Sequence, residues 1–459
     1  MRSRGSQANQ ERAPLVTFAL GLSTFLTLFD VTAVVVALPG IRTDLDFSLA
    51  DAAWVIDAYS LAFTGALVVS GTLADRFGRR RSMLSGNAVF LLTSIACGMA
   101  PNGPLLLAAR AAQGIGAAFM TTGAIALVAG AFPNLTQRAR AFGVIGIISG
   151  VAMALGPTLG GLLAAQFGWR WIFYANVSFC AALAIAVPRL VAEVRAADRR
   201  PLDVLGVALL TISLGLVIDA LLRRDGSPAL RLSLLAGGAI LAALFDLQQW
   251  RSRRPVFDPR IFATPAMIAV GLLLIAIQFG YWALLVYLPL FLNAGLAMSM
   301  AAVGTALLTA TLPMLLIPLI GGRFVMRWGW RRFFIIAFGV VAAGDGLLVV
   351  AALSSDSTMR LVATCAGMVT IGVGTAFANP QMSGVALALT PPAQAGMASA
   401  VTMIVRQAGF AISIAVLGAA LGESGTAGAF AGPFALAGVI SLCAVLVALV
   451  LLPAKSPLD

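Results

Sequence analysis

Long apolar runs, separated by short charged or Gly/Pro-rich segments, recur from one end of this chain to the other. The sequence has 459 residues, of which 60% are hydrophobic and 10% are charged, whereas a typical soluble domain is about 25% charged. A water-soluble core cannot enclose that much apolar sequence, but a bilayer can, at about 20 residues for each spanning helix. The pattern therefore predicts an all-α polytopic membrane protein.

The runs predict fourteen transmembrane helices in three groups. Residues 1–190 are expected to form an N-terminal six-helix bundle, 191–260 an inserted two-helix linker, and 261–459 a C-terminal six-helix bundle. The expected spans are residues 14–38, 50–71, 83–100, 104–131, 140–164, 170–189, 203–222, 230–250, 265–292, 300–322, 332–353, 360–380, 394–420 and 430–452.

The net charge of +12 reflects membrane topology. Basic residues fall in short clusters between the apolar runs, not in one domain or arm, so we expect no nucleic-acid partner. With a cytoplasmic N-terminus, most Lys and Arg lie on the inner side, which is the bias of inner-membrane proteins. We therefore expect a multi-pass protein of the bacterial cell (inner) membrane with both termini in the cytoplasm.

Residue usage limits the chemistry. Histidine is absent, and Cys97, Cys180, Cys365 and Cys443 lie in apolar runs without metal-ligand spacing, so we expect buried apolar cysteines and no metal site. Any proton chemistry must then use carboxylates. No phosphate-binding loop motif occurs, so ATP is not expected as a direct energy source. We expect no cofactor, with a proton gradient as the energy source.

Three charged residues lie inside predicted spans of the first half. Asp30 precedes the outer end of its span, and Asp57 follows the outer start of the next, so both are expected roughly 11 to 12 Å below the outer surface. A buried acid that protonates near neutral pH can exchange its proton for a cargo. Arg110, inside the fourth span, is costly unless it faces a cavity or a partner. A snorkelling Arg110 and hydrogen-bonding acids are the alternatives.

Two further motifs occupy span ends and helix interiors. The first follows the second span, and its single acid among arginines suits a salt-bridge latch, or alternatively a simple positive anchor. A weaker copy, with Met326 in place of the acid, follows the tenth span. The second motif, in the fifth span, combines glycines that allow close helix packing with a proline that bends the helix. The motif residues are Gly71, Asp75, Arg76, Gly78, Arg79 and Arg80, and then Gly150, Gly156, Pro157, Gly160 and Gly161.

Taken in order, these motifs resemble the major facilitator superfamily, specifically its fourteen-span drug:proton antiporter family of the multidrug efflux type. The resemblance covers essentially the whole chain and includes the run around Asp30 and the segment from Leu106 to Ala118. It implies the major facilitator fold, a cytoplasmic gate at residues 71–80, proton coupling through Arg110, and an antiporter motif at residues 150–161. The family pattern has asparagine where this chain has Val35.

Residues for cargo binding are harder to assign. Arg406 stands in an Arg-Gln-x-Gly sequence of the thirteenth span that is similar to a family pattern, and no acid partner for it is evident. Aromatic residues in such helices more often pack or face lipid. The roles of Asp345, Asp219 and Asp246 stay open. The candidate substrate-binding residues are Phe29, Gln113, Tyr281, Trp282 and Arg406.

The resemblance implies a proton-coupled antiporter that exports small amphipathic or hydrophobic compounds, such as drugs and antibiotics, by alternating access. It is not expected to be an enzyme. Its partners would be a small-molecule substrate, protons and the lipid bilayer, and its two halves predict a monomer. A dedicated exporter of one metabolite is the first alternative. A membrane receptor that moves nothing is the second, and the short loops argue against it.

Overall fold

The computed structural model of the chain describes residues 2–132, 135–194, 203–223, 227–252, 264–390, 395–421 and 426–453, which contain helices and no strand. The helices are α1 (Arg2–Asp44), α2 (Leu49–Phe77), α3 (Arg79–Gly98), α4 (Gly103–Ala131), α5 (Leu135–Phe167), α6 (Arg170–Leu190), α7 (Val204–Leu222), α8 (Pro228–Arg251), α9 (Pro265–Ile277), the π-helix η2 (Gln278–Trp282), α10 (Ala283–Leu296), α11 (Met300–Leu316), α12 (Pro318–Leu353), α13 (Ser357–Ala388), α14 (Ala395–Ala419), the 3-10 helix η4 (Ala427–Phe430) and α15 (Ala431–Leu451).

Within these ranges, 11 helices are long and apolar enough to cross a membrane. A helix occupies each of the fourteen expected ranges, but α2, α3 and the 17-residue α11 do not reach that threshold. The expectation of an all-helical polytopic protein is therefore confirmed, and the count of fourteen spans is not.

Polar side chains mark where many of the helices begin. At the start of α2, Ser48 and Asp51 form a reciprocal capping box, which satisfies backbone N–H groups that the first helical turn leaves without partners. Further side-chain caps begin α4, α7, α8, α9, α11 and α13, and these are Asn102, Asp203, Ser227, Thr264, Ser299 and Asp356.

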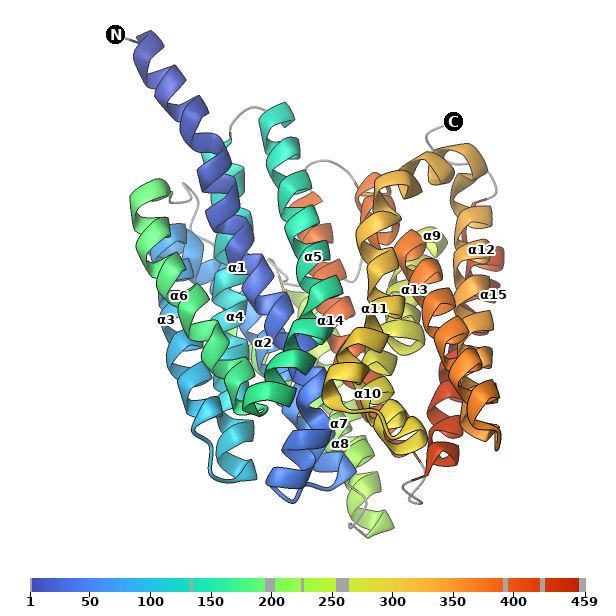
Figure 1. Ribbon diagram of the computed structural model, residues 1–459. Coiled ribbons are helices and arrows are strands. Elements are labelled where there is room, and N and C mark those ends of the chain that lie inside the picture. The colour runs from blue at the N-terminus through green and yellow to red at the C-terminus, as the bar shows by residue number, and fades with distance from the viewer. Residues whose placement is uncertain are drawn as a thin grey trace.

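The helices form two packed halves. Helices α1 to α6 pack mainly against one another, as do α9 to α15, and Figure 1 shows the two groups side by side, with the beginning of α1 and the end of α15 at the same end of the molecule. One apolar core cluster draws residues from both halves, among them Val36 of α1 and Leu307 of α11. The halves are thus joined by a continuous apolar core.

Direct contact between the halves is closest along α5 and α11. A Cβ atom added at Gly161 would lie 2.6 Å from the carbonyl oxygen of Met300 and 3.1 Å from Cα of Gly304. On the same stripe of α5, nearer the end that carries the termini, Gly143 and Gly146 have nothing within 4 Å of such an atom. Figure 1 shows α5 and α11 diverging toward that end. The halves therefore touch along one part of their interface and separate along the other.

Helices α7 and α8 form a hairpin between the two halves of the sequence. The hydroxyl of Ser213 donates to the carbonyl of Gly238 over 2.8 Å, and Asp203 accepts from the side chains of Gln248 and Gln249 over 3.0 and 2.8 Å. Helix α7 also packs against α2 and α14. One helix of the hairpin therefore contacts both halves.

The repeated motif adopts the same backbone irregularity in both halves. Gly78 has a φ of 112° between α2 and α3, and Gly329, at the equivalent position of the second copy, has a φ of 73° inside α12. Positive φ is strained for residues with a side chain. A tenth span was expected to run to residue 322, but α11 ends at Leu316 and α12 begins at Pro318, because proline lacks the N–H that would continue the helix.

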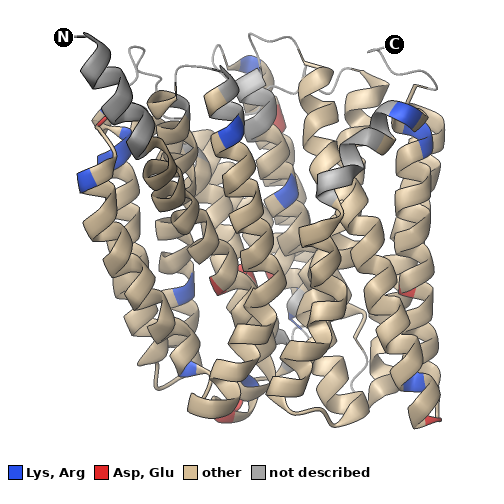
Figure 2. Cartoon of the chain, turned by 45° about the horizontal axis from the view of Figure 1, so that its top comes forward, with Lys and Arg blue, Asp and Glu red and all other residues tan. Residues whose placement is uncertain are grey.

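Charged side chains gather mainly toward the two ends of the helices and leave long uncharged stretches between them (Figure 2), as expected for helices that cross a bilayer. The cysteines depart from the sequence-based expectation. Cys97 and Cys180 are buried, Cys365 is partly exposed and Cys443 is exposed. The prediction of four buried cysteines was wrong for the last two, because an apolar run does not reveal which face of a helix meets a neighbour.

Candidate functional site

A network of buried polar side chains lies in the N-terminal half and centres on Asp30 of α1. Nη1 of Arg110, on α4, lies 2.6 Å from Oδ2 of Asp30. Gln113 and Asn176 donate hydrogen bonds from their side-chain nitrogens to Oδ1 over 3.1 and 2.7 Å. These four side chains are fully buried. The carboxylate thus receives donors from two other helices, α4 and α6.

Arg110 points into the bundle and does not snorkel. Its Nε donates to the carbonyl of Val55 over 3.0 Å, and its Nη1 also donates to the side-chain oxygen of Gln113 over 2.6 Å. The guanidinium lies 4.5 Å from the ring centroid of Tyr59 and 5.8 Å from that of Phe173. Its Nη2 has no hydrogen-bond partner within the described residues. Because a buried charge is tolerated where a counter-ion lies close, the carboxylate of Asp30 explains how the arginine is accommodated.

Asp57 of α2 is also fully buried. Neither of its carboxylate oxygens has a hydrogen-bond partner within the described residues. The structure therefore brings Asp30, Arg110 and Gln113 together. Asp57, which was expected at the same depth as Asp30, lies outside their hydrogen-bond network. A buried carboxyl group without partners carries a large desolvation cost.

Sequence reasoning missed two members of the network. Asn176 is the donor nearest to Oδ1 of Asp30, and the hydroxyl of Ser94 accepts from Gln113 over 2.8 Å. The available signal was an amide in the apolar run of α6, since polar side chains in membrane helices usually face a partner helix.

The arginine motif after α2 makes its described contacts within its own half. Arg79 donates to the carbonyl of Ala126 over 3.1 Å, and Arg80 donates to that of Val191 over 3.0 Å. The backbone N–H groups of Arg80 and Arg81 donate to the carboxylate of Glu193. These contacts join the motif to α4 and to the segment after α6.

Four other positions of the proposed gate differ in surroundings. A Cβ atom at Gly78 would lie 2.7 Å from the carboxylate of Glu193, and one at Gly71 would lie 3.6 Å from Thr122. Arg76 is exposed and lies 5.5 Å from the ring centroid of Phe77. The side chain of Asp75 lies outside the described residues. A latch between the halves therefore stays a prediction.

The glycine motif of α5 is a site of close helix approach. Added Cβ atoms at Gly156 and Gly160 would meet Thr32 and Ala33 of α1, at 2.0 and 2.7 Å, whereas Gly161 faces α11. One at Gly150 would make ordinary contact with Leu315, at 3.4 Å. Pro157 lies inside α5 without ending it. The motif thus contacts one helix of each half.

Two hydrogen bonds cross between the halves beside this motif. The hydroxyl of Thr158 donates to the carbonyl of Gly304 over 2.9 Å, and the hydroxyl of Thr311 donates to that of Ala154 over 3.0 Å. Sequence reasoning had not singled out either threonine. These bonds fix the register of α5 against α11.

The aromatic candidates are mostly packed. Phe29 is 3% exposed and stacks on Phe25 with ring centroids 5.8 Å apart. Tyr281 is buried and donates its hydroxyl hydrogen to the carbonyl of Ala310 over 3.0 Å. Trp282 is partly exposed, and its indole N–H has no hydrogen-bond partner in the described part of the chain. Of the three, only Trp282 retains a free polar group.

In the C-terminal half, Arg406 of α14 donates to the side chains of Asn379 and Ser383 of α13 over 2.9 and 3.0 Å. Asp345 of α12 is fully buried and accepts from the hydroxyl of Ser441 over 2.8 Å. These two charged residues therefore bond to neutral partners.

The acids of the hairpin lie near helix ends. Asp219 pairs with Arg223, one turn along α7, at 2.9 Å. Asp246 is exposed on α8. Neither contacts the network around Asp30.

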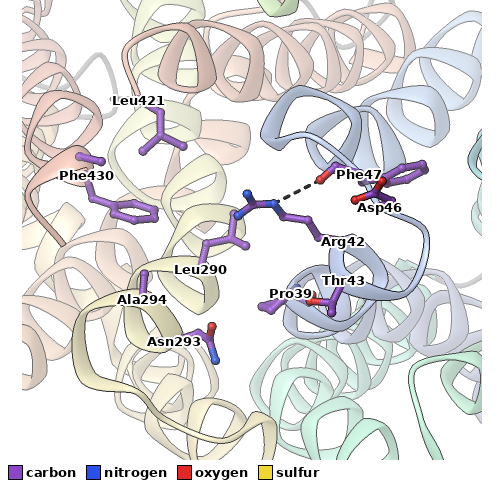
Figure 3. A pocket seen from close by; sticks show the side chains of 11 residues that line it. Pro39, Arg42, Thr43, Asp46, Phe47, Leu290, Asn293, Ala294, Leu421 and Phe430 are labelled. Carbon is purple, nitrogen blue, oxygen red and sulfur yellow. Dashed lines mark hydrogen bonds between the residues drawn. The ribbon is translucent and has the colours of Figure 1, made fainter. Parts of the chain in front are cut away.

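A pocket of about 320 Å³ lies where the two halves meet, at the end remote from the start of α1. In Figure 3, Arg42 of α1 extends toward Leu290 of α10 and Leu421, and its Nε donates to the carbonyl of Phe47 over 3.2 Å. The other residues that line the pocket are Pro39, Thr43, Asp46, Asn293, Ala294, Ala429 and Phe430.

Membrane-length helices in two contacting halves, with charged residues buried inside each, define a polytopic membrane protein. This chain belongs to the Major Facilitator Superfamily, whose family model matches residues 20–413 and, in an overlapping match, residues 270–459. It is therefore a transporter and not an enzyme.

Similar proteins include antibiotic resistance and export proteins. The chain is 31% identical over 410 residues to the multidrug resistance protein Stp of Mycobacterium tuberculosis, covering 89% of this chain and 75% of that one. It is 32% identical over 452 residues to the cephamycin export protein CmcT of Amycolatopsis lactamdurans, covering 93% and 89%. The crystal structure of a peptide transporter POT in complex with sulfate shares the fold, with a TM-score of 0.71 at 16% identity, covering 96% of this chain and 97% of that one.

Proposed function

We propose that this protein is a proton-coupled antiporter that exports small amphipathic or hydrophobic compounds, such as drugs and antibiotics, by alternating access. The observation that carries the proposal is the fully buried pair of Asp30 and Arg110, 2.6 Å apart. Protonation of Asp30 removes one of the two charges, so the pair weakens and the helices that it joins are free to rearrange. Binding of cargo and protonation of Asp30 would then favour different conformations of the protein.

The topology proposed with this function has fourteen spans, because α2, α3 and α11 lie in the same bundle as the 11 membrane-length helices. The termini are placed in the cytoplasm of a bacterial cell membrane on the basis of the arginine bias. Residues 1–190 and 261–459 are the two moving bundles of a monomer, and residues 191–260 are the insert. The gate role of the motif at residues 71–80 and the contribution of Asp57 belong to the same proposal.

Transport by reconstituted protein tests the coupling. Proteoliposomes containing wild type, Asp30→Asn or Asp219→Asn receive a pH gradient, and the movement of several fluorescent amphipathic dyes is followed. The wild type is expected to accumulate dye in acidic vesicles and Asp30→Asn to lose that accumulation. Asp219→Asn is the matched control, because its ion pair with Arg223 is partly exposed and such pairs contribute little. Gradient-driven transport by Asp30→Asn at the wild-type rate would overturn the proposal.

An exporter dedicated to one compound is the second candidate, favoured by the name of the relative CmcT, which is a cephamycin export protein. The same vesicles distinguish the two. Transport of several unrelated dyes supports broad export, whereas proton-driven transport of a single compound supports the dedicated alternative.

A further inference from the structure

Arg406 places a guanidinium near the middle of α14. It lies 11 residues after the start of that helix at Ala395, or about 16 Å along the axis, and it is partly exposed. Its guanidinium donates to the amide oxygen of Asn379 over 2.9 Å and to the hydroxyl of Ser383 over 3.0 Å. Both partners are neutral, so neither balances the charge.

The two described acids of the C-terminal half do not pair with Arg406. Asp345 accepts from Ser441, and Asp356 caps the start of α13. Glu423 and Asp459 lie outside the described residues. A charge at membrane depth normally pairs with an opposite charge or faces a water-filled path, and no acid described in this half supplies that opposite charge to Arg406.

Arg110 differs from Arg406 in both burial and ion pairing. Arg110 is fully buried and lies 2.6 Å from the carboxylate of Asp30. Arg406 is partly exposed, and no ion pair involves it in the described part of the chain. Arg110 is therefore neutralised internally, whereas Arg406 has no ion pair among the described residues.

The π-helix η2 packs against α14 and carries two polar side chains, Gln278 and Trp282. The amide of Gln278 donates to the backbone oxygen of Arg406 over 2.6 Å and thereby ties the π-helix η2 to α14. Trp282, at the other end of η2, has an indole N–H without an acceptor in the described ranges. Single π-helical turns inside α-helices often occur at functional sites. Helix α14 also packs against α2 and α7, so this region lies beside the N-terminal half.

We infer that Arg406 forms a subsite for the negatively charged group of the cargo, and that carboxylate-bearing amphipathic compounds are preferred substrates. The inference rests on the proposed function as an exporter. A guanidinium binds a carboxylate through parallel charge-assisted hydrogen bonds, and the cargo would supply the missing counter-charge. Asn379 and Ser383 orient the guanidinium from α13.

Equilibrium binding tests the inference without a gradient. The purified full chain is titrated with N-dansyl-phenylalanine and with its uncharged methyl ester, which share the same apolar part, and dansyl fluorescence reports binding. The wild type is expected to bind the acid about tenfold more tightly than the ester. Arg406→Gln should bring the two affinities within about twofold, and Arg406→Lys should keep part of the preference because the charge remains. Arg327→Gln, an exposed arginine on α12, should leave the preference unchanged.

Asn379→Asp provides a second test that preserves side-chain shape. It places a carboxylate beside Arg406, so it should abolish the preference for the acid even if Arg406→Gln does not fold. Equal binding of the two compounds by the wild type, binding of neither, or loss of both affinities alike in Arg406→Gln overturns the inference. If wild-type vesicles accumulate dyes under a pH gradient and binding shows no preference for the acid, the proposed function stands and this inference fails. If the wild type prefers the acid but its vesicles show no gradient-driven transport, the anion subsite stands and the proposed function fails.

Discussion

Asn176 shows how a single amide can tune a buried acid. Its Nδ2 donates to Oδ1 of Asp30 over 2.7 Å, and both side chains are fully buried. A hydrogen bond donated to a carboxylate favours the charged form over the protonated one, and charge-assisted bonds are worth about 1.5 to 3 kcal/mol. Asn176 therefore helps Arg110 to stabilise the buried carboxylate of Asp30.

Asn176→Ala is expected to lower the free energy of unfolding by about 1.5 to 3 kcal/mol, because it removes a hydrogen bond to a buried carboxylate, and to reduce gradient-driven transport. Asn87→Ala is the matched control. Asn87 is also a buried asparagine, but it donates to the neutral backbone oxygen of Cys180 at 3.0 Å. Thermal unfolding and vesicle transport measure both variants, and only Asn176→Ala should affect transport. Transport by Asn176→Ala at the wild-type rate would remove Asn176 from the coupling mechanism.

Asp57 presents the opposite situation, a buried carboxyl group with no partner among the described residues. Such a group costs about 1 to 3 kcal/mol, and proteins keep costly groups where function requires them. Asp57→Leu, which has a similar shape, should therefore raise the melting temperature in detergent while lowering gradient-driven transport. Asp30→Leu should lower the melting temperature, since it leaves the charge of Arg110 unpaired. A lower melting temperature for Asp57→Leu would show that the carboxyl group has a stabilising partner.

The sequence was sufficient to find Asp30, Asp57 and Arg110, because a charge inside an apolar run is conspicuous and costly. It was not sufficient to find Asn176 or Ser94. Short polar residues are common in membrane helices, and only the packed structure tells which of them face a charge. The same limit applies to Cys443, whose exposed side chain depends on which face of α15 is covered.

Among the elements, the start of α3 is held by a segment from the far end of its own bundle. Glu193 accepts hydrogen bonds from the backbone N–H groups of Arg80 and Arg81 over 2.9 and 3.2 Å, and the N–H of Arg79 donates to the carbonyl of Val194. An anion at a helix N-terminus is stabilised both by these donors and by the helix dipole. The segment after α6 therefore caps the start of α3 through hydrogen bonds.

Glu193→Ala is expected to lower the free energy of unfolding by about 1 to 2 kcal/mol, the cost of losing an N-terminal cap. Arg81→Ala should cost less than about 0.5 kcal/mol. Its side chain is 69% exposed, and its Nε lies 4.0 Å from Oε2 of Glu193. Exposed ion pairs contribute little. Thermal unfolding of the purified proteins measures both. Equal losses in the two variants would mean that the ion pair with Arg81, and not the N-terminal cap, stabilises the contact between Glu193 and the start of α3.

Most helices could be predicted because a spanning helix must be long and apolar. The break between α11 and α12 and the π-helix η2 were not predicted. A π-helical turn differs from an α-helix by one hydrogen-bond register and leaves no apolar periodicity to read. Contact of α7 with both halves was also beyond reach, since hydropathy does not specify neighbours.

Considered as a whole, the molecule is closed along one part of its interface and parted along the other. A Cβ atom added at Gly161 would contact the backbone of α11, whereas one added at Gly143 or Gly146, on the same stripe of α5, would have nothing within 4 Å. If the halves move as rigid bodies, closing the parted end must open the contacting end. Bulk at Gly161 and bulk near Gly146 should therefore oppose different conformations.

Cysteine accessibility tests this reciprocity. In a variant whose four native cysteines are replaced by serine, a cysteine at Gly146 is expected to react with a polar maleimide at least about tenfold faster than one at Ala154, which is fully buried. Adding Gly161→Ala forces a methyl group against the carbonyl of Met300, and overpacking of this kind costs about 1 to 3 kcal/mol. Labelling at Ala154 should then rise and labelling at Gly146 should fall, whereas Leu162→Phe, at an exposed position of the same helix, should change neither. If Gly161→Ala raises labelling at both positions, the interface loosens locally and the two halves do not rock as rigid units.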